Sequence, residues 1–369
     1  MPRTRQATLG LLGLLWAGPA VAGELLYVSE GNRLHRVDLD SVERPPLLRD
    51  VLISSSKDDP VNGRDINGMI CPLADGSGRF IASEDTGQPD TPGGWALLAP
   101  DGRQLGKLTA TARSELTEPF GCAFDAQGQL FTSEVGDPGF LRANGQLIQW
   151  FAPFDHFPGP PGAYPETAEP SANFCKLVID LGTTGGLAVD PQGRVYVTAS
   201  SRGAIYRYTP PFPKAPDANG GCGGTDSLGS PRADRVFGET FVRALATFSG
   251  LAMSPHGTLY AASVLTGQIF EYELDGGRRL RTILDSPHWL PPHPHGTPQG
   301  LAVDSAGTLY YADLDLQREG LFGIDTGPDG KVWRIRFDAE GTPLEPEVIL
   351  DGLSFPDGLG VLPGDLEGR

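Results

Sequence analysis

Basic residues and cysteines are scarce in this 369-residue sequence, and no long apolar segment follows residue 22. The chain holds 29 Lys and Arg against 46 Asp and Glu, which gives a formal net charge of −17. An acidic balance without a basic cluster argues against nucleic acids and anionic membranes as partners. The motifs of the α/β-hydrolase nucleophile elbow, the HExxH zinc proteases, c-type haem attachment and the P-loop are all missing. What remains is an acidic protein with no membrane span and none of the commonest enzyme signatures.

The amino-terminal segment has the pattern of a secretory signal peptide. Two arginines precede a short apolar stretch, Leu9–Trp16, and the sequence AVA follows at Ala20–Ala22. A basic start, an apolar core and an A-x-A site are typical of a cleaved signal, and the stretch is shorter than the roughly 20 residues of a membrane span. We expect residues 1–22 to be removed and residues 23–369 to form one domain, exported to the periplasm or secreted.

One hairpin pattern recurs along the chain. It reads GLAVDPQGRVYVTAS from Gly186, GLAMSPHGTLYAAS from Gly250 and GLAVDSAGTLYYAD from Gly300, and further copies begin at Gly121 and Gly68. Each copy has two apolar runs around a turn rich in polar residues and glycine, which predicts two antiparallel strands. Repeats at intervals of this length are typical of solenoids and propellers.

A third and a fourth strand follow each hairpin, as in GAIYRYTP at 203–210 and FVRALATF at 241–248. Four strands per repeat are the content of a propeller blade. A sixth repeat starts at Gly358 but stops at Leu362, and the strands that it lacks match LLYVSEGNRLHRVDLD at 25–40. The sequence therefore predicts an all-β fold, a six-bladed β-propeller with four-stranded blades. Its amino-terminal strands complete the carboxyl-terminal blade and close the ring.

These glycine-led units resemble those of the SMP-30/gluconolactonase/LRE and NHL-repeat superfamily of six-bladed propellers. The resemblance covers essentially the whole chain after residue 22. It implies the propeller fold, but that superfamily includes lactonases, esterases, strictosidine-synthase-like proteins and plain binding scaffolds. The resemblance therefore leaves both a catalytic and a non-catalytic function open.

Polar residues gather at one end of the predicted propeller. The inner strand of each blade starts where the second strand ends, and we call this end the top face. Asn67 and Asp357 come just before first-strand glycines, while Glu30 and Glu84 end second strands. Oxygen side chains that converge on one channel mouth are the ligands that a hard divalent cation such as Ca²⁺ prefers. We expect these four residues to bind such an ion.

The resemblance supports two of the four ligands. In gluconolactonase-like proteins a Glu, Asn residues and an Asp hold the metal, in NG and PDG contexts, and Asn67 and Asp357 match those contexts. Phe120, Gly185 and Ser249 depart from that pattern at other strand starts. Asn-Gly and Asp-Gly are also common turn pairs, so a turn without a metal is the other interpretation.

A segment rich in proline and histidine, SPHWLPPHPHGTPQG at 286–300, leads into the fifth blade on the top face. Its histidines are His288, His293 and His295. We take His295 as a candidate general base, together with the Asp357 carboxylate, because an imidazole titrates near neutral pH. Two other interpretations stay open. One is a His-x-His transition-metal site, and the other is a rigid proline-rich lid with solvated histidines. We also expect Trp289 to form a hydrophobic wall for a ligand.

The four cysteines divide into two pairs. Cys71 and Cys122 fall in first strands, where small apolar side chains belong, and we expect them to be buried free thiols. Cys175 and Cys222 fall in long connections of neighbouring blades on the bottom face, opposite the top face. A disulfide between Cys175 and Cys222 would stabilise these connections in an oxidising compartment.

These observations favour an exported, divalent-metal-dependent hydrolase of lactones or related esters, with a small-molecule ligand at the channel mouth. The metal would polarise the carbonyl, and a carboxylate or histidine would activate water. The alternative is a non-catalytic NHL-type binding or scaffold propeller. A quinoprotein sugar dehydrogenase is a further candidate, because GKVWRIRFDAEG at 330–341 resembles the blade edges of those enzymes.

Overall fold

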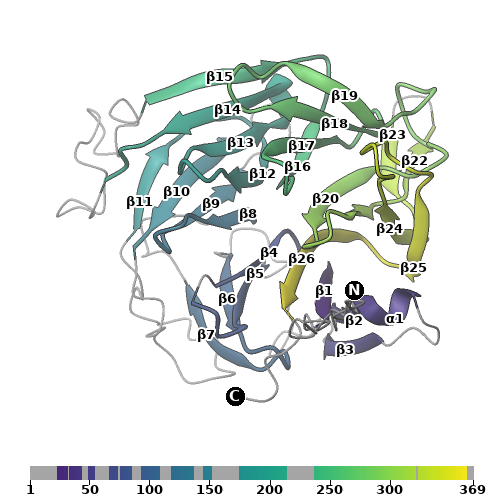
Figure 1. Ribbon diagram of the computed structural model, residues 1–369, viewed down its shortest axis with the longest axis horizontal. Coiled ribbons are helices and arrows are strands. Elements are labelled where there is room, and N and C mark those ends of the chain that lie inside the picture. Colours follow the sequence, from purple (N-terminus) through teal and green to yellow (C-terminus); the bar gives the residue numbers. More distant parts are fainter. Residues whose placement is uncertain are drawn as a thin grey trace, which may run out of the picture.

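Six four-stranded antiparallel sheets stand around a central axis in the computed structural model of the protein (Figure 1). This arrangement confirms the predicted all-β fold, a six-bladed propeller. The predicted signal peptide, residues 1–22, lies outside the residues that the structure describes. The described residues are 23–31, 33–43, 49–54, 66–73, 75–84, 93–108, 118–136, 144–151, 174–213, 237–320 and 323–363.

Each blade begins with an inner strand beside the central axis, and the repeated glycine lies at or near its start. The inner strands of blades 1 to 6 are β4 (Ile70–Pro72), β8 (Pro119–Phe124), β12 (Thr184–Val189), β16 (Phe248–Met253), β20 (Pro298–Val303) and β26 (Pro356–Pro363). The second strands are β5 (Phe80–Glu84), β9 (Leu130–Glu134), β13 (Val195–Ala199), β17 (Thr258–Ser263), β21 (Leu309–Asp313) and β1 (Glu24–Glu30).

The outer half of each blade consists of a third and a fourth strand. The third strands are β6 (Gly94–Leu98), β10 (Gln146–Trp150), β14 (Ala204–Thr209), β18 (Gln268–Glu273), β24 (Gly330–Ile335) and β2 (Arg33–Asp38). The fourth strands are β7 (Gln104–Leu108), β11 (Phe174–Val178), β15 (Phe237–Arg243), β19 (Arg279–Leu284), β25 (Glu347–Leu353) and β3 (Arg49–Ser54).

Three short elements stand outside this pattern. They are the helix α1 (Leu39–Glu43), the 3₁₀ turn η1 (Ser200–Arg202) and a separate hairpin of β22 (Leu316–Glu319) with β23 (Gly323–Thr326), which lies between β21 and β24. No helix in the described ranges is long and apolar enough to cross a membrane.

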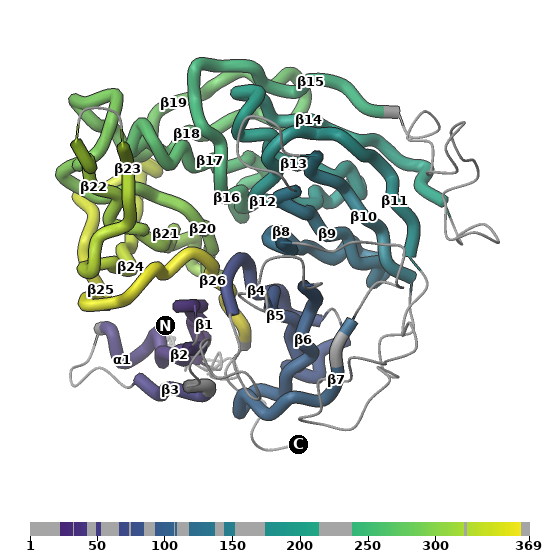
Figure 2. The backbone as a smooth tube through the Cα atoms, turned by 180° about the vertical axis from the view of Figure 1, so that it is seen from behind, coloured from purple at the N-terminus to yellow at the C-terminus, as the bar shows by residue number. Residues whose placement is uncertain are grey.

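Blade 6 is assembled from both ends of the chain. β26 pairs with β1, so that Leu25 lies opposite Leu362 and Ser29 lies opposite Gly358. Figure 2 shows the yellow β26 between the purple β1 and the β4 strand of blade 1. The predicted closure of the ring by the amino-terminal strands is confirmed.

The repeated glycines allow neighbouring inner strands to approach closely. A Cβ atom at one glycine of each blade would lie within 3.0 Å of a backbone carbonyl oxygen in the next blade, closer than real Cβ atoms come. Any other residue would therefore push two blades apart. The glycines and the residues whose carbonyls they meet are Gly68 and Phe120, Gly121 and Gly185, Gly186 and Ser249, Gly250 and Gln299, Gly300 and Asp357, and Gly358 and Gly68.

Apolar side chains fill the space between adjacent blades, because alternate residues of a strand face opposite neighbours. In β1, Leu26 and Val28 pack with residues of blade 5, while Tyr27 packs with residues of blade 1. Trp95 and Trp150 are fully buried in the layer between blades 1 and 2. Apolar side chains thus pack on both faces of each such strand, and this packing sets the position of the strand's top end.

Hydroxyl groups join neighbouring blades near the top of the second strands. Each of three hydroxyls contacts a backbone carbonyl oxygen of the next inner strand. The pairs are Ser29 with Gly68, Ser133 with Gly185 and Thr198 with Ser249. The equivalent hydroxyl of Ser83 is buried, and none of the described residues forms a hydrogen bond with it. The joint between blades 1 and 2 therefore lacks this bond.

A disulfide spans the same joint. Cys71 of β4 and Cys122 of β8 are bonded, with their Cα atoms 6.1 Å apart. The prediction that these cysteines are free thiols is wrong. The Met69 N–H donates to the Phe120 carbonyl at 2.7 Å, and this register sets the two cysteines side by side.

The second predicted pair is only partly within the described ranges. Cys175 lies buried in β11 and is disulfide-bonded. Cys222 lies outside the described residues. The Cys175–Cys222 disulfide therefore stays a prediction.

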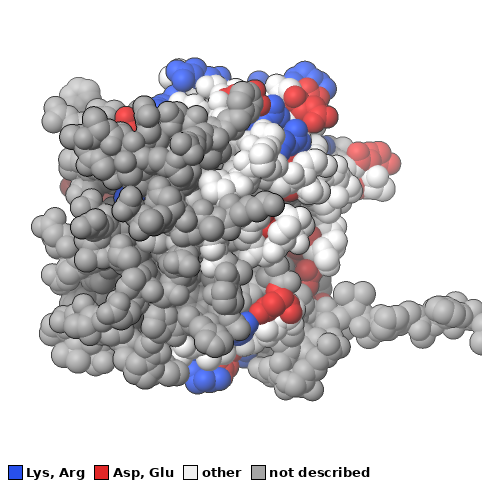
Figure 3. Space-filling model, turned by 90° about the vertical axis from the view of Figure 1, so that its left-hand side faces the viewer, with Lys and Arg blue, Asp and Glu red and all other residues white. Residues whose placement is uncertain are grey.

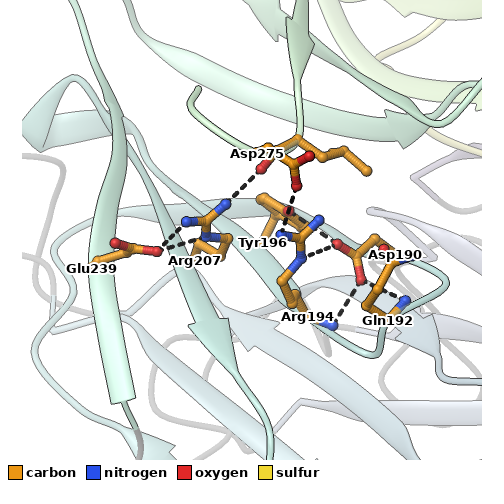
Figure 4. Close-up of polar contacts among 8 residues, drawn as sticks. Asp190, Gln192, Arg194, Tyr196, Arg207, Glu239 and Asp275 are labelled. Carbon is orange, nitrogen blue, oxygen red and sulfur yellow. Dashed lines mark hydrogen bonds and ion pairs between the residues drawn. The ribbon is translucent and has the colours of Figure 1, made fainter. Parts of the chain in front are cut away.

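The bottom face is built from tight turns that satisfy their own polar groups. In the β12–β13 turn, Asp190 accepts the backbone N–H groups of Gln192 and Arg194 at 3.0 and 2.9 Å (Figure 4). Its second oxygen binds the Arg194 side chain and the Tyr196 hydroxyl. Arg194 also reaches Asp275 of blade 4 at 3.4 Å. Burial, together with the Asp190 charge, raises the pKa of Tyr196 to about 12. The side chains of Asp190, Arg194 and Tyr196 therefore stabilise the turn.

Candidate functional site

Unusual backbone conformations concentrate on the top face. Asp180, Asp315 and Phe355 have positive φ values of 60°, 51° and 60°, and they are the non-glycine residues with positive φ among those described. Each lies in a connection on the top face. Side chains rarely adopt this region, and such strain clusters at functional sites. The top face therefore carries the kind of backbone strain that is typical of functional sites.

Asp357 lies buried at the start of β26. Its Oδ1 accepts the N–H of Gly68 at 2.9 Å and lies 3.0 Å from the hydroxyl oxygen of Ser29. Gly68 follows the half-buried Asn67. The structure thus places Asp357 beside the Asn67 segment of the neighbouring blade. The Asp357 carboxylate takes part in the hydrogen bonds that join these two blades.

Glu30 ends β1, and its carboxylate binds groups of its own blade. One oxygen contacts Nε2 of the buried His35, whose Nδ1 lies 3.0 Å from an Arg49 nitrogen. The other oxygen accepts the Ser354 N–H at 2.6 Å and lies 3.6 Å from Arg33. Burial raises the pKa of Glu30, but the hydrogen bonds and these charges outweigh it and leave the pKa below its ordinary value. Both oxygens are therefore engaged.

The polar residues at the ends of second strands share a structural role that sequence analysis missed. Each accepts the backbone N–H of the segment that leads into the inner strand of its own blade. The pairs are Glu30 with Ser354 at 2.6 Å, Glu134 with Glu118 at 3.3 Å, Ser263 with Thr247 at 3.2 Å and Asp313 with Thr297 at 2.7 Å. The signal was present in the sequence, because an acceptor recurs at the same position of most blades.

These contacts decide how well the predicted ligands fit a cation. In the described part of the chain, no three His, Cys, Asp or Glu side chains form a group that could hold a metal ion. Glu30, Glu84 and Asp357 are therefore not one metal-binding group, although each is buried on the top face. The residues present do not fit a carboxylate-rich Ca²⁺ site. The metal site stays a prediction.

The segment 285–297 is held at several points of the top face. Its anchors come from the β17–β18 turn, from β21 and from β22, as well as from the segment itself. They are His293 Nε2 with Leu265 O at 2.9 Å, His293 Nδ1 with Ser286 Oγ at 2.7 Å, Arg318 Nε with Pro291 O at 3.0 Å and the Tyr311 hydroxyl with His295 O at 2.9 Å. These bonds agree with a rigid segment over blades 4 and 5.

The His295 side chain lies beside blade 5. Its ring is edge-on to Trp333, with centroids 5.8 Å apart, and its Nε2 lies 3.4 Å from a carboxylate oxygen of Glu345. Asp357 lies in blade 6, and no contact described for His295 reaches it. The pairing of His295 with Asp357 as catalytic groups thus stays a prediction without a supporting contact.

Exposed apolar side chains also gather on the top face. In the described ranges, the side chain of Trp289 is 66% exposed and that of Leu245 is 81% exposed. Both lie in connections between blades on this face. The exposed apolar residues of the top face are Leu245, Trp289, Leu290, Ile324 and Phe355. Trp289 and Leu290 are adjacent in one connection, and the other three lie in three further segments of the same face.

Acidic groups accompany these apolar side chains. Asp285, Asp325 and Asp329 are exposed on the top face, and Asp329 is paired with Lys331 at 2.9 Å. On the outer side of the molecule, basic and acidic side chains of the described residues lie next to each other (Figure 3). Exposed basic residues, Arg33, Arg202 and Arg318, lie on the top face as well, so it carries charges of both signs.

Comparison with known proteins places the fold. No protein-family model matches the sequence, and no curated protein matches it. A solved protein of unknown function from Bacteroides caccae is 12% identical, with 92% of this chain and 99% of that chain covered and a TM-score of 0.54. A chain of the nidogen/laminin complex is 13% identical, with coverage of 93% and 99% and a TM-score of 0.54.

The luciferin-regenerating enzyme is 15% identical, with 93% of this chain and 96% of that chain covered and a TM-score of 0.50. Identities this low show the fold alone. The chain therefore shares the six-bladed propeller fold with these structures.

Proposed function

We propose that the protein binds a small organic ligand on its top face and hydrolyses lactones or related esters there. The observation that carries the proposal is the gathering of exposed apolar side chains on that face, with Trp289 and Leu290 on an anchored segment. A rigid apolar surface binds a ligand without the entropic cost of ordering a loop. The positive-φ residues on the same face add support.

The charge of the top face supports a neutral substrate. Exposed acidic groups, Asp285 and Asp325, and exposed basic groups, Arg202 and Arg318, lie on the same face, so no single sign of charge favours an ionic substrate. A lactone or a simple ester carries no charge at its reacting group. The substrate class that fits is therefore a neutral ester or lactone with an apolar portion.

A divalent cation, with Ca²⁺ as the first choice, is a separate part of the proposal. Its support is that Asp357 lies beside the Asn67 segment, where Oδ1 accepts the Gly68 N–H. The carboxylates do not form a metal-binding group in the described ranges, so hydrolysis is not routed through an ion. Metal analysis of the purified protein tests this part independently of activity.

The second candidate is a non-catalytic binding propeller of the NHL type. It is favoured by the structural use of Glu30 and Asp357, whose carboxylates are engaged in hydrogen bonds that hold blades together. One of the matching structures is a complex of nidogen with laminin, which is an association between proteins. In this case the same top face would bind a partner without reaction.

Export is proposed together with this function. The Cys71–Cys122 disulfide supports it, because disulfides persist in the periplasm and outside the cell and are rare in a reducing cytosol. A fusion to a reporter that is active only after export tests the role of residues 1–22, and an inactive reporter would contradict it.

A panel of neutral lactones and aryl esters tests the proposed reaction. We expect hydrolysis of at least one apolar ester or lactone, faster than that of an anionic analogue with the same reacting group. The assay is repeated with EDTA and with added Ca²⁺, so that metal dependence is measured separately. Absence of hydrolysis across the panel, with and without Ca²⁺, would favour the binding propeller.

A further inference from the structure

A serine and a histidine are hydrogen-bonded to each other within the top-face segment 285–297. The hydroxyl oxygen of Ser286 lies 2.7 Å from Nδ1 of His293. The other ring nitrogen, Nε2, lies 2.9 Å from the carbonyl oxygen of Leu265. A carbonyl oxygen can only accept a hydrogen bond, so Nε2 carries the hydrogen of the neutral ring. Nδ1 then presents a lone pair to the Ser286 hydroxyl.

The surroundings of His293 keep this ring neutral near neutral pH. Burial lowers the pKa of His293, and nearby His288 lowers it further, whereas the bond to Leu265 and the charge of Asp313 act in the opposite direction. The net pKa lies below the ordinary value. A neutral imidazole that accepts a hydroxyl proton and is oriented by a third group is the arrangement of an activated nucleophile.

We propose that Ser286 and His293 are the nucleophile and general base of a top-face site that hydrolyses esters or lactones. This inference rests on the hydrolase of the proposed function, but it needs no metal ion. It assigns the base role to His293 rather than to His295, whose ring contacts Trp333 and Glu345.

The groups around Ser286 define the substrate class. Trp289 and Leu290 follow in the same segment and are 66% and 43% exposed, which suits an apolar acyl group. The backbone N–H of His288 donates to Ser286 Oγ at 3.3 Å and helps to hold the hydroxyl oxygen in place. Asp285 accepts the Ser286 N–H at 2.9 Å and would repel an anionic substrate. A neutral ester or lactone with an apolar acyl group fits this site.

The pair is held in place before any ligand arrives. A Cβ atom on Gly267 would lie within 3.0 Å of the His293 ring, so the ring packs directly on the backbone of the β17–β18 turn. The Leu265 carbonyl beside it fixes the rotation of the ring. Rigid placement of nucleophile and base is what acyl transfer requires.

The reaction balances with water as the co-reactant. Ser286 Oγ bonds to the carbonyl carbon while its proton moves to His293 Nδ1. Collapse of the tetrahedral intermediate breaks the ester C–O bond, the leaving oxygen takes the proton from Nδ1, and the acyl group stays on Ser286. Water then attacks the acyl carbon and gives a proton to Nδ1, and Ser286 Oγ leaves with that proton.

A fluorophosphonate probe tests the nucleophile in the unaltered protein. Such a probe forms a covalent adduct with a serine that a neighbouring base activates. After labelling and digestion, mass spectrometry identifies the modified residue. We expect the major adduct on Ser286. No adduct on Ser286, under conditions that label a control serine hydrolase completely, would overturn the proposal.

Two variants test the pair in turnover. Ser286→Ala and His293→Gln should each lower kcat/KM for p-nitrophenyl butyrate by about 100-fold or more, as expected for loss of a nucleophile or its base. Ser305→Ala and His256→Gln change the same residue types in exposed bottom-face turns and should keep the wild-type rate. Thermal melting of each variant shows whether it is folded.

The outcomes separate this inference from the proposed function. If the wild type hydrolyses the ester and folded Ser286→Ala retains the rate, the inference is wrong and the hydrolase stands. If the probe labels Ser286 but no ester or lactone is hydrolysed, the activated serine stands and the proposed hydrolase is wrong.

Discussion

The hydroxyl oxygen of Ser29 lies 3.0 Å from the carboxylate of Asp357, although 328 positions separate the two residues in the chain. The same hydroxyl accepts the N–H of Gly358 at 2.9 Å and lies 3.0 Å from the carbonyl oxygen of Gly68. The hydroxyl of Ser29 in β1 thus contacts β26 within blade 6 and also the start of blade 1. The closure of the ring depends on buried polar bonds as well as on strand pairing.

Asp357→Ala should destabilise the fold by about 1–3 kcal/mol, because it leaves the buried N–H of Gly68 without its acceptor. Asp357→Asn is the matched control, since it keeps an acceptor oxygen and should cost less. Urea unfolding with EDTA and with Ca²⁺ provides the measurement. A loss of stability seen only with Ca²⁺ would contradict the structural role and support a metal site instead.

Glu30 should contribute stability that disappears in acid. Its pKa is lowered in the fold from an ordinary value of 4.5, so the carboxylate stabilises the fold above the unfolded pKa. That contribution is lost as the pH falls through the lowered folded pKa. The groups that face it are His35, Arg33 and Arg49, the last through His35.

Comparison of the wild type with Glu30→Gln, by urea unfolding from pH 7 down to pH 3, measures this contribution. The difference in unfolding free energy should be constant near neutral pH and shrink below about pH 4.5. A difference that does not depend on pH would mean that the charge of Glu30 adds nothing to stability.

Removal of the Cys71–Cys122 disulfide should cost about 2–4 kcal/mol, as expected for a bond that closes a long loop. The loss of stability should be concentrated at the joint of blades 1 and 2, because the Ser83 hydroxyl forms no hydrogen bond with the described residues there. The Cys71→Ser/Cys122→Ser double variant and hydrogen exchange of blade 1 test this. Uniform protection in the two proteins would contradict a local effect.

Gly300→Ala should destabilise the protein severely, because its Cβ would lie within 3.0 Å of the Asp357 carbonyl oxygen. Gly276→Ala is the matched control. A Cβ at Gly276 meets only a side-chain oxygen of Glu273, at 3.3 Å. Thermal unfolding of both variants gives the comparison, and equal melting temperatures would show that the inner strands separate at little cost.

The fold could be predicted because the glycine of each hairpin repeat lies near the start of an inner strand. A glycine at 121, 186, 250 and 300 marks the start of an inner strand in each case. The first repeat is looser, and here the same reasoning failed for the cysteines. Cys71 comes three residues after its glycine and Cys122 one residue after, so alignment of the glycines hides a pairing that the backbone register of β4 with β8 produces.

The site was harder to predict, because a position at a strand end does not fix which way a side chain turns. Glu30 lies on the top face as expected, but its carboxylate accepts a hydrogen bond from the backbone N–H of Ser354. The histidine segment was identified as a candidate, yet its sequence gave no reason to prefer His293. Only the contacts with Leu265 and Ser286 distinguish His293 from its neighbours.

The ring of glycine and carbonyl contacts has no first or last member. Each blade presents a carbonyl to one neighbour and a glycine to the other, in the same rotational sense all the way round. Glu24 of β1 pairs with Pro363 of β26, so a short linker could join these two strands. Circular permutation, with new termini in the exposed turn at His256, would then leave every contact of the ring in place, because the order of the blades in space does not depend on where translation starts.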